Sequence, residues 1–260
     1  MKKKIIKIIK KKNRTKIVCL TAYSKNIASI LDKYCDIILV GDSLGSVLYN
    51  YKTTRQVTLN TMIEHSKSVK DGINKSLMVV DMPYNTYRNK NEALRNAKKI
   101  IKKTRCDAVK LEGGKNIINI IKHLIKNKVA VMGHIGLLPQ YETGKFRFKG
   151  TSKNTLERNK IFNDAMALDE AGVFSIVLEC IETSLAKKIT NKISIPSIGI
   201  GASANCDGQI LVTDDLIGLN SINVRFVKKY INLNKVIGKA VLKFKKDVKK
   251  IIFPAKKQSY

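Results

Sequence analysis

The stretch IILVGDSLG, residues 37–45, joins four apolar residues to a glycine and an acid. Ile37 to Val40 form a continuous aliphatic run without polar alternation, which is typical of a strand buried on both faces of a parallel sheet. The run ends at Gly41, and a carboxylate follows at once. The stretch therefore predicts a buried parallel strand that carries Asp42 at its carboxyl end.

Seven more apolar runs alternate along the chain with segments of helical periodicity. The expected strands are residues 16–22, 37–41, 77–81, 107–112, 129–134, 174–179, 195–201 and 208–214. The expected helices are residues 25–33, 59–71, 91–103, 115–126, 156–171, 182–191 and part of 226–250. Asn91 and Thr155 are expected as N-caps, and Gly72 and Gly172 as helix ends. This alternation predicts an α/β fold of the (β/α)8 TIM-barrel type, with a doubly wound open sheet as the alternative.

No linker rich in proline, glycine or serine divides the 260 residues, so we expect a single domain. Within it, residues 1–15 are expected to form a basic N-terminal extension or short helix, and residues 232–260 a basic C-terminal helix and tail. Residues 137–154 have no clear period, and they fit a lid or oligomer contact as well as a solvated surface loop.

The chain is strongly basic, with 50 Lys and Arg against 20 Asp and Glu and a formal net charge of +30. Such a charge attracts nucleic acid or anionic membranes. The lysines are nevertheless spread along the whole chain, and no nucleic-acid-binding motif accompanies them. We therefore expect no specific nucleic-acid partner and no membrane association, and keep a nucleic-acid-binding protein as an alternative.

The 5 cysteines are far apart and never spaced as CxxC, which indicates reduced thiols. No apolar run is long enough to cross a bilayer, and the amino-terminal segment lacks a secretory apolar region. A cytoplasmic location is the expectation.

Most of the apolar runs end in chemically active side chains. These are Asp42 with Ser43, Asp81, Lys110 and Glu112 on one run, His134, Glu179, and Asp214. A carboxylate after a strand is often only the N-cap of the next helix, and this is the simpler reading of Asp42 alone. In a barrel, however, the carboxyl ends of all strands meet on one face, which is where the active site lies. Together the residues predict a site.

Clustered carboxylates repel one another unless a cation or protons are present. Asp42, Asp81 and Glu112 offer hard oxygen ligands, so the expected ion is Mg²⁺, which keeps positions open for substrate oxygens. An ion beside Lys110 suits a small α-keto acid, whose enolate it would stabilise. Glu179, from a different strand, could remove the proton next to the carbonyl. His134 could be a ligand or a hydrogen-bonding partner.

Gly199 and Gly201 have the spacing of a phosphate cradle in the run SIPSIGIG, residues 194–201. A pair of this kind is weak evidence. Close packing of the backbone against a neighbouring strand is an equal alternative.

Several long motifs, in one order, resemble the ketopantoate hydroxymethyltransferase family. They are VCLTAYS (18–24), ILVGDSLG (38–45), VTLNTMIEHSKSV (57–69), VVDMPY (79–84), AVKLEGG (108–114), VMGHIGLLPQ (131–140), AGVFSIVLEC (171–180) and SIPSIGIGASANCDGQILVTDDLIGL (194–219). A looser likeness to the phosphoenolpyruvate mutase and isocitrate lyase group, which also uses Mg²⁺ and keto acids, is the second candidate.

The resemblance implies a TIM-barrel transferase that catalyses the first step of pantothenate biosynthesis. It implies transfer of a hydroxymethyl group from 5,10-methylenetetrahydrofolate to 3-methyl-2-oxobutanoate, giving 2-dehydropantoate, with Mg²⁺ as cofactor. By matching motifs, the metal residues are Asp42, Asp81 and Glu112, the substrate contacts are Asp42, Ser43, Asp81 and Lys110, and the proton acceptor is Glu179. The resemblance also implies a homodecamer built as a pentamer of dimers.

The chain departs from the family pattern at a few positions. Ser203 and Ala204 stand where the family has Gly and Pro, so we expect backbone strain at Ser203. Thr151 replaces an arginine of the expected lid. None of these positions belongs to the implied metal set.

Overall fold

The computed structural model describes residues 3–142, 154–220 and 224–260. Most of the expected lid, including Thr151, lies outside the described residues. The chain divides into two compact units, Met1–Val212 and Thr213–Tyr260, each of which is described by itself. The expectation of one domain over all 260 residues stays a prediction.

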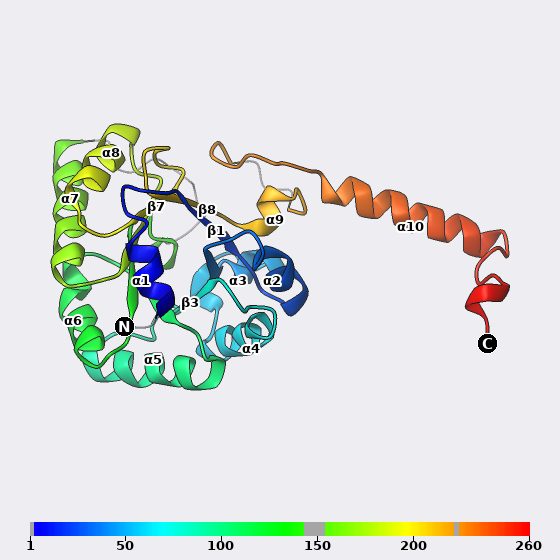
Figure 1. Ribbon diagram of the computed structural model, residues 1–260, viewed down its shortest axis with the longest axis horizontal. Helices are drawn as coiled ribbons and strands as arrows, with labels where there is room; N and C mark the ends of the chain where they lie inside the picture. The colour runs from blue at the N-terminus through cyan, green and yellow to red at the C-terminus, as the bar shows by residue number, and fades with distance from the viewer. Residues whose placement is uncertain (1–2, 143–153, 221–223) are drawn as a thin grey trace. The chain divides into compact units, whose positions relative to one another are not determined.

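The first unit is a closed barrel of eight parallel strands in chain order, which confirms the predicted TIM barrel (Figure 1). The strands are β1 (Ile17–Thr21), β2 (Ile37–Val40), β3 (Leu77–Asp81), β4 (Ala108–Glu112), β5 (Val131–Gly136), β6 (Ser175–Glu179), β7 (Ser197–Ile200) and β8 (Gly208–Leu211). Strand β1 pairs with both β2 and β8, which closes the ring. All eight predicted strands are present.

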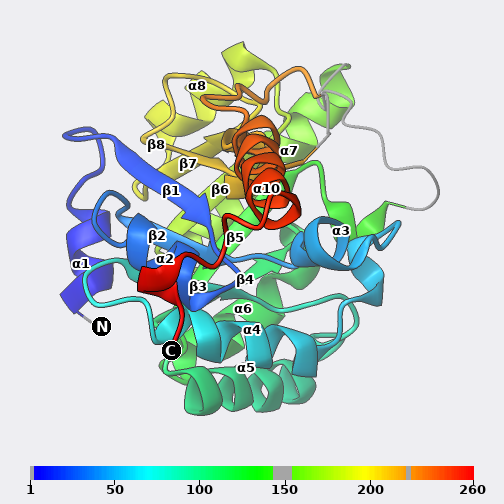
Figure 2. The same cartoon turned by 90° about the vertical axis from the view of Figure 1, so that its right-hand side faces the viewer.

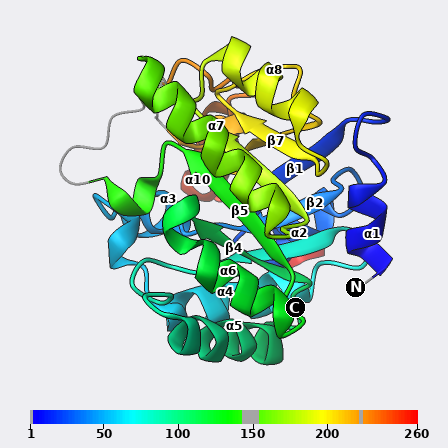
Figure 3. The same ribbon diagram turned by 90° about the vertical axis from the view of Figure 1, so that its left-hand side faces the viewer.

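Helices surround the ring and lie between successive strands in the chain, except α1, which precedes β1 (Figure 3). In this unit they are α1 (Lys3–Ile9), α2 (Lys25–Leu31), α3 (Leu44–Tyr49), α4 (Leu59–Lys70), α5 (Lys90–Thr104), α6 (Ile118–Lys126), α7 (Thr155–Glu170) and α8 (Thr183–Lys192), with short 3₁₀ turns η1 (Thr54–Gln56), η2 (Lys115–Ile117) and η3 (Pro139–Tyr141). Two N-cap predictions were wrong: Asn89, not Asn91, caps α5, and Asn154, not Thr155, caps α7.

The opening stretch shows how the strands are buried on both faces. Ile37 and Leu39 belong to an apolar cluster inside the barrel, whereas Ile38 and Val40 belong to the cluster between the strands and the helices. The inner cluster also contains Ile5 and Ile8 of α1, both buried. Helix α1 (Figure 2) therefore buries one residue of each apolar pair, Ile5 and Ile8, against the barrel interior, whereas Ile6 is exposed.

The second unit contains α9 (Thr213–Leu216), α10 (Leu233–Lys249) and η4 (Lys256–Gln258). No residue of α10 is buried. Asp214 lies in α9, because β8 ends at Leu211. The prediction that Asp214 ends the eighth strand was therefore wrong.

Candidate active site

Strand register brings the first predicted side chains together at the carboxyl ends of the strands. Asp81 of β3 is the register partner of Lys110 of β4, and Lys110 Nζ lies 3.1 Å from Asp81 Oδ1. The backbone N–H of Asp42 donates to Asp81 Oδ2 at 3.1 Å. A Cβ at Gly41 would lie 2.9 Å from Ser43 Oγ and 3.6 Å from Asp81 Oδ2. The glycine before Asp42 thus leaves room for this arrangement.

Asp42 does not act as a helix cap. The N-cap of α3 is Ser43, without a side-chain capping bond. The Asp42 carboxylate is buried and accepts a hydrogen bond from Gln140 Nε2 at 2.7 Å. The simpler reading of Asp42, as an N-cap, is therefore not supported by its contacts.

Gln140 is a site residue that sequence reasoning missed. It is buried, and its Nε2 also donates to the Met82 carbonyl at 3.0 Å. Its backbone N–H donates to Glu112 Oε2 at 3.0 Å, and its Oε1 accepts from the Tyr87 hydroxyl at 2.5 Å. Gln140 therefore connects two of the three predicted metal carboxylates. It lies in η3, beyond the end of β5, where no strand periodicity points to a site.

His134 joins the cluster to the predicted base. It is the register partner of Glu112, with Nδ1 3.6 Å from Glu112 Oε1 and 3.2 Å from Lys110 Nζ. On the opposite side of the imidazole ring, Nε2 lies 3.1 Å from Glu179 Oε2. Burial and the Lys110 charge oppose protonation, but the hydrogen bonds with both glutamates raise the pKa of His134 to about 9. His134 therefore lies between two carboxylates, within ion-pair distance of each.

The backbone is unusual at two positions next to Glu179, namely Gly136 and Cys180. A Cβ at Gly136, whose φ is +97°, would lie only 2.2 Å from the Glu179 carbonyl oxygen, so glycine is required there. Cys180, directly after Glu179, has a φ of 52°, in the left-handed region that non-glycine residues rarely adopt. Its N–H donates to the Ile200 carbonyl at 2.9 Å, which holds the turn in place. Strained backbone of this kind often accompanies functional side chains.

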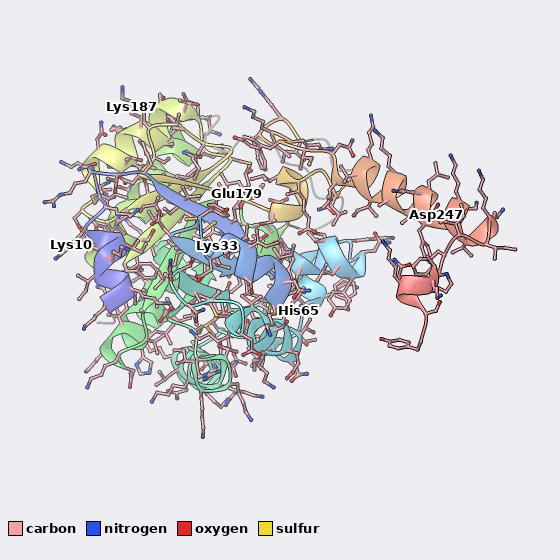
Figure 4. All side chains as sticks on the ribbon, turned by 45° about the vertical axis from the view of Figure 1, so that its right-hand side comes forward. Lys10, Lys33, His65, Glu179, Lys187 and Asp247 are labelled. Atoms are coloured by element: carbon pink, nitrogen blue, oxygen red, sulfur yellow. The ribbon has the colours of Figure 1, made fainter. Side chains whose placement is uncertain are left out.

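Ser43 also has a partner that sequence reasoning missed. Its Oγ lies 2.8 Å from the hydroxyl of Tyr23, a buried residue that follows β1. The predicted catalytic and substrate residues thus lie at the ends of β2, β3, β4 and β6. Figure 4 labels Glu179 on the barrel unit.

The site carries more negative than positive charge. Burial, together with the charges of Asp81 and Glu112, raises the pKa of Asp42 well above its ordinary value. Burial also raises the pKa of Asp81, although Lys110 opposes this. For Glu112 the penalty of burial is outweighed by His134 and Lys110, and its pKa is lowered. The two aspartates are therefore carboxylates for which the protein supplies too little positive charge.

The donor set fits Mg²⁺ better than a closed structural metal site. Within residues 3–142, 154–220 and 224–260, no three His, Cys, Asp or Glu side chains form a group able to hold a metal by themselves. Mg²⁺ commonly takes only one or two carboxylates and keeps water or substrate oxygens as its other ligands. Asp42 and Asp81 are adjacent, and too little positive charge surrounds their carboxylates, so this pair matches that requirement. Glu112, in contrast, is contacted by Gln140 and His134. The metal roles stay predictions.

The seventh strand and its following loop do not show the features of a phosphate cradle. A Cβ at Gly199 would lie 3.0 Å from Gln209 Oε1 and 3.1 Å from Cys206 Sγ, so this glycine serves close packing. The prediction of strain at Ser203 was wrong, because positive φ in this loop falls on Gly201 and not on Ser203. The Ser203 hydroxyl instead accepts a hydrogen bond from the N–H of Asn205 at 3.2 Å.

Comparison with known proteins gives a consistent family match. Residues 2–256 match the family model described as ketopantoate hydroxymethyltransferase. A 3-methyl-2-oxobutanoate hydroxymethyltransferase of Pelagibacter ubique is 66% identical over 260 residues, covering 100% of both chains. The enzyme of the same name from Rhizobium etli is 49% identical, covering 92% of this chain and 88% of the relative.

Solved structures with low sequence identity share the fold. A 2,3-dimethylmalate lyase, described as a member of the PEP mutase/isocitrate lyase superfamily, has a TM-score of 0.64 at 13% identity and covers 100% of this chain and 89% of its own. A phosphonopyruvate hydrolase in complex with oxalate and Mg²⁺ has a TM-score of 0.62 at 10% identity, with coverage of 98% and 93%. At such identities the likeness concerns the barrel alone.

Proposed function

Because this chain belongs to the ketopantoate hydroxymethyltransferase family and is a transferase, we propose that it transfers a hydroxymethyl group from 5,10-methylenetetrahydrofolate to 3-methyl-2-oxobutanoate. The product is 2-dehydropantoate, and the reaction is the first step of pantothenate biosynthesis. The observation that carries the proposal is the buried cluster in which Asp81, Lys110 and Glu179 are connected through His134.

Asp42 and Asp81 would hold Mg²⁺, with Glu112 as the third metal residue. When bound, the ion would act as a Lewis acid that polarises the keto group of the substrate and makes the hydrogen on C3 more acidic. Support comes from the two aspartates, whose raised pKa values mark a place where a dication would be favoured.

Lys110, Ser43 and the two aspartates bind the keto acid. The Lys110 ammonium is buried, and its pKa is raised by Asp81 and the other carboxylates despite the cost of burial, so it stays charged. A buried ammonium is suited to the substrate carboxylate. Ser43, positioned by Tyr23, offers a hydroxyl beside Asp42. These contacts orient the keto acid before proton transfer.

Glu179 removes the proton from C3. The carboxylate is buried at the end of β6, and its Oε2 lies 3.1 Å from His134 Nε2, which leaves Oε1 for the substrate. The resulting carbanionic C3 forms a bond to the one-carbon unit of the folate, and the two carbon–nitrogen bonds of the methylene bridge break. Water supplies the hydroxyl oxygen, and tetrahydrofolate leaves with the proton from C3 and one proton from water. Proton abstraction next to a carbonyl by a positioned carboxylate is ordinary general-base chemistry.

The direct test is product formation by the purified protein from 3-methyl-2-oxobutanoate, methylenetetrahydrofolate and Mg²⁺. We expect 2-dehydropantoate, detected by mass spectrometry, and its loss when the ion is chelated. Absence of 2-dehydropantoate under these conditions would reject the proposal. Product that persists in the presence of chelator would reject the role of Mg²⁺ alone.

The protein is proposed to act as a cytoplasmic homodecamer, a pentamer of dimers. The apolar face of α10 supports assembly, because a helix with such a face is usually packed against other protein. Its apolar residues include Val236, Ile237, Val241, Phe244 and Val248. Sedimentation velocity should give ten times the chain mass, and a monomer would contradict the assembly.

Specific nucleic-acid and membrane partners are not part of the proposal. In the described parts of the chain, no helix is both long and apolar enough to cross a membrane. Exposed lysines are distributed over separate parts of the chain, as Lys10, Lys33 and Lys187 illustrate in Figure 4. Tight, salt-dependent binding to DNA duplexes that survives replacement of Asp42 and Asp81 would favour the nucleic-acid alternative.

A further inference from the structure

Two tyrosines and an arginine meet on loops that follow the carboxyl ends of the strands. Tyr84 lies three residues after β3, Tyr141 ends η3, and Arg55 belongs to η1. The rings of Tyr84 and Tyr141 are edge-to-face, with centroids 6.3 Å apart and an interplanar angle of 87°. Arg55 Cζ lies 4.1 Å from the Tyr84 ring centroid, and its guanidinium also donates to the Tyr84 hydroxyl. We call Arg55, Tyr84 and Tyr141 the tyrosine shelf.

Hydrogen bonds connect the tyrosine shelf to the candidate active site. The hydroxyls of Tyr141 and the buried Tyr87 share a hydrogen bond. Tyr87 also donates to Gln140 Oε1 at 2.5 Å, and Gln140 Nε2 donates to Asp42 at 2.7 Å. The tyrosine shelf is therefore two side chains removed from the Asp42 carboxylate. Its position is set by the same contacts that set the carboxylates.

Tyr141 combines a fixed orientation with an exposed ring. Its hydroxyl is tied to Tyr87, and Tyr84 meets its ring, yet 46% of the residue remains exposed. An aromatic side chain held in this way loses little conformational entropy when a flat ligand stacks on it. The arrangement fits a conjugated ring better than an aliphatic group or a charged one.

The two proposed substrates differ in the feature that the tyrosine shelf would recognise. The keto acid has no ring, and its carboxylate and keto oxygens need the charged groups of the carboxylate cluster. The folate carries a flat bicyclic pterin ring, and its reacting methylene group is attached to that ring system. A pterin on the tyrosine shelf would therefore bring the methylene group to the edge of the keto-acid site.

We propose that the tyrosine shelf binds the pterin ring of the folate cosubstrate by stacking, with Tyr141 as the principal contact. This inference rests on the proposed function. It assigns the two substrates to different residues: the folate ring to Tyr141, Tyr84 and Arg55, and the keto acid to the buried charged cluster.

The test compares Tyr141→Ala with Tyr141→Phe by calorimetric titration of tetrahydrofolate under anaerobic conditions. Loss of one aromatic stacking partner should weaken tetrahydrofolate binding roughly tenfold to hundredfold in the alanine variant. The phenylalanine variant keeps the ring and should stay within about threefold of wild type, since only a hydrogen bond is lost. The KM for 3-methyl-2-oxobutanoate should change less than that for the folate in both variants.

Tyr34→Ala is the matched control, because Tyr34 is 74% exposed and lies between α2 and the amino end of β2. It should bind tetrahydrofolate like wild type. Thermal unfolding of each variant shows whether the fold is retained, and Tyr141→Phe still reports on the ring if the alanine variant unfolds. The proposal for the tyrosine shelf is overturned if a fully folded Tyr141→Ala protein binds the folate with wild-type affinity. It is also overturned if this variant loses keto-acid affinity as strongly as folate affinity. If the wild-type protein makes no 2-dehydropantoate, the proposed function itself is overturned.

Discussion

Aspartates at the two ends of the barrel have opposite electrostatic environments. Before the strands begin, Asp32 accepts hydrogen bonds from the backbone N–H groups of Asn74, Lys75 and Ser76. Burial alone would raise its pKa, but these bonds lower it. Where the strands end, burial raises the pKa values of Asp42 and Asp81. The same residue type is stabilised as an anion at one end and destabilised at the other.

A second aspartate at the amino ends follows the same rule. Asp207, directly before β8, receives Lys12 Nζ at 2.8 Å and the N–H of Ser197 at 2.9 Å. Although burial opposes it, these contacts lower the pKa of Asp207. Acids at the amino ends are thus satisfied by groups of the protein itself, and they hold strands in place. At the carboxyl ends, Asp42 and Asp81 also have partners, but these do not outweigh burial, as expected where a ligand completes the charge balance.

The largest effect is expected at the carboxyl ends, from Glu179→Gln. The substitution keeps the size of the side chain and removes its basicity. A positioned general base contributes roughly 10² to 10⁴ in rate, so exchange of the C3 hydrogen of 3-methyl-2-oxobutanoate with solvent deuterium should slow by that factor. NMR in D₂O measures the exchange directly, with no need for the folate.

Glu182→Gln is the control for this prediction. Glu182 lies three residues after Glu179, at the start of α8. It is exposed and forms an ion pair with Arg158. Exchange at the wild-type rate is expected there. If Glu179→Gln also exchanges at the wild-type rate, another group is the base.

Gln140→Ala should have the next largest effect. The variant removes the donor to Asp42 and the acceptor for Tyr87 while it keeps the backbone bond to Glu112. Partners that orient metal carboxylates typically contribute 10- to 100-fold in metal affinity, so we expect roughly that loss in Mg²⁺-dependent binding of the keto acid. Titration calorimetry with Mg²⁺ and 3-methyl-2-oxobutanoate measures it.

The exposed Gln56 provides a control substitution to alanine, which should leave this binding unchanged. A Gln140→Ala protein that binds the ion and the keto acid as tightly as wild type would show that Asp42 needs no orienting partner.

At the amino end, the expected effect is on stability. Asp32→Asn keeps the shape but replaces charge-assisted hydrogen bonds by neutral ones, which should cost about 1 kcal/mol in the free energy of unfolding. Because the folded-state pKa of Asp32 is lowered from 3.8, its contribution is fully present above that pH and is lost as the pH falls through the folded-state pKa. The difference between variant and wild type should therefore be constant near neutral pH and shrink below about pH 4.

Urea unfolding at several pH values measures this difference. Asp71→Asn, at an exposed aspartate that ends α4, is the control and should shift stability by less than about 0.5 kcal/mol. A difference for Asp32→Asn that grows as the pH falls would contradict the assigned direction of the pKa shift.

The strands could be predicted because each contains a short apolar run, which is the usual sequence pattern of a parallel strand buried on both faces. The caps were misplaced by one or two residues because several polar residues stand together. Both true caps, Asn89 and Asn154, accept a hydrogen bond from the N–H of a glutamate three residues later, Glu92 and Glu157. The spacing N-x-x-E was present in the sequence and would have identified both.

The site could be predicted only as far as the strands define it. Strand register places Asp81 beside Lys110 and Glu112 beside His134, so residues at strand ends can be assigned together. Gln140, in contrast, reaches the site from a 3₁₀ turn, and loop side chains carry no periodic signal. Which polar residues complete the network therefore depends on the three-dimensional path of the loops.

The smallest effect is expected for Ser203→Gly, which introduces the residue that the family resemblance implies at this position. Ser203 is not in the left-handed region, since Gly201 provides the positive φ of this loop, with a value of 59°. The substitution therefore relieves no strain, and it removes the hydroxyl that accepts from the N–H of Asn205. We expect a change within about 0.5 kcal/mol in unfolding free energy and an unchanged rate of 2-dehydropantoate formation. A stabilisation well above that value would show that the loop stores strain at Ser203 after all, and would separate it from the well-satisfied loops at the amino ends of the strands.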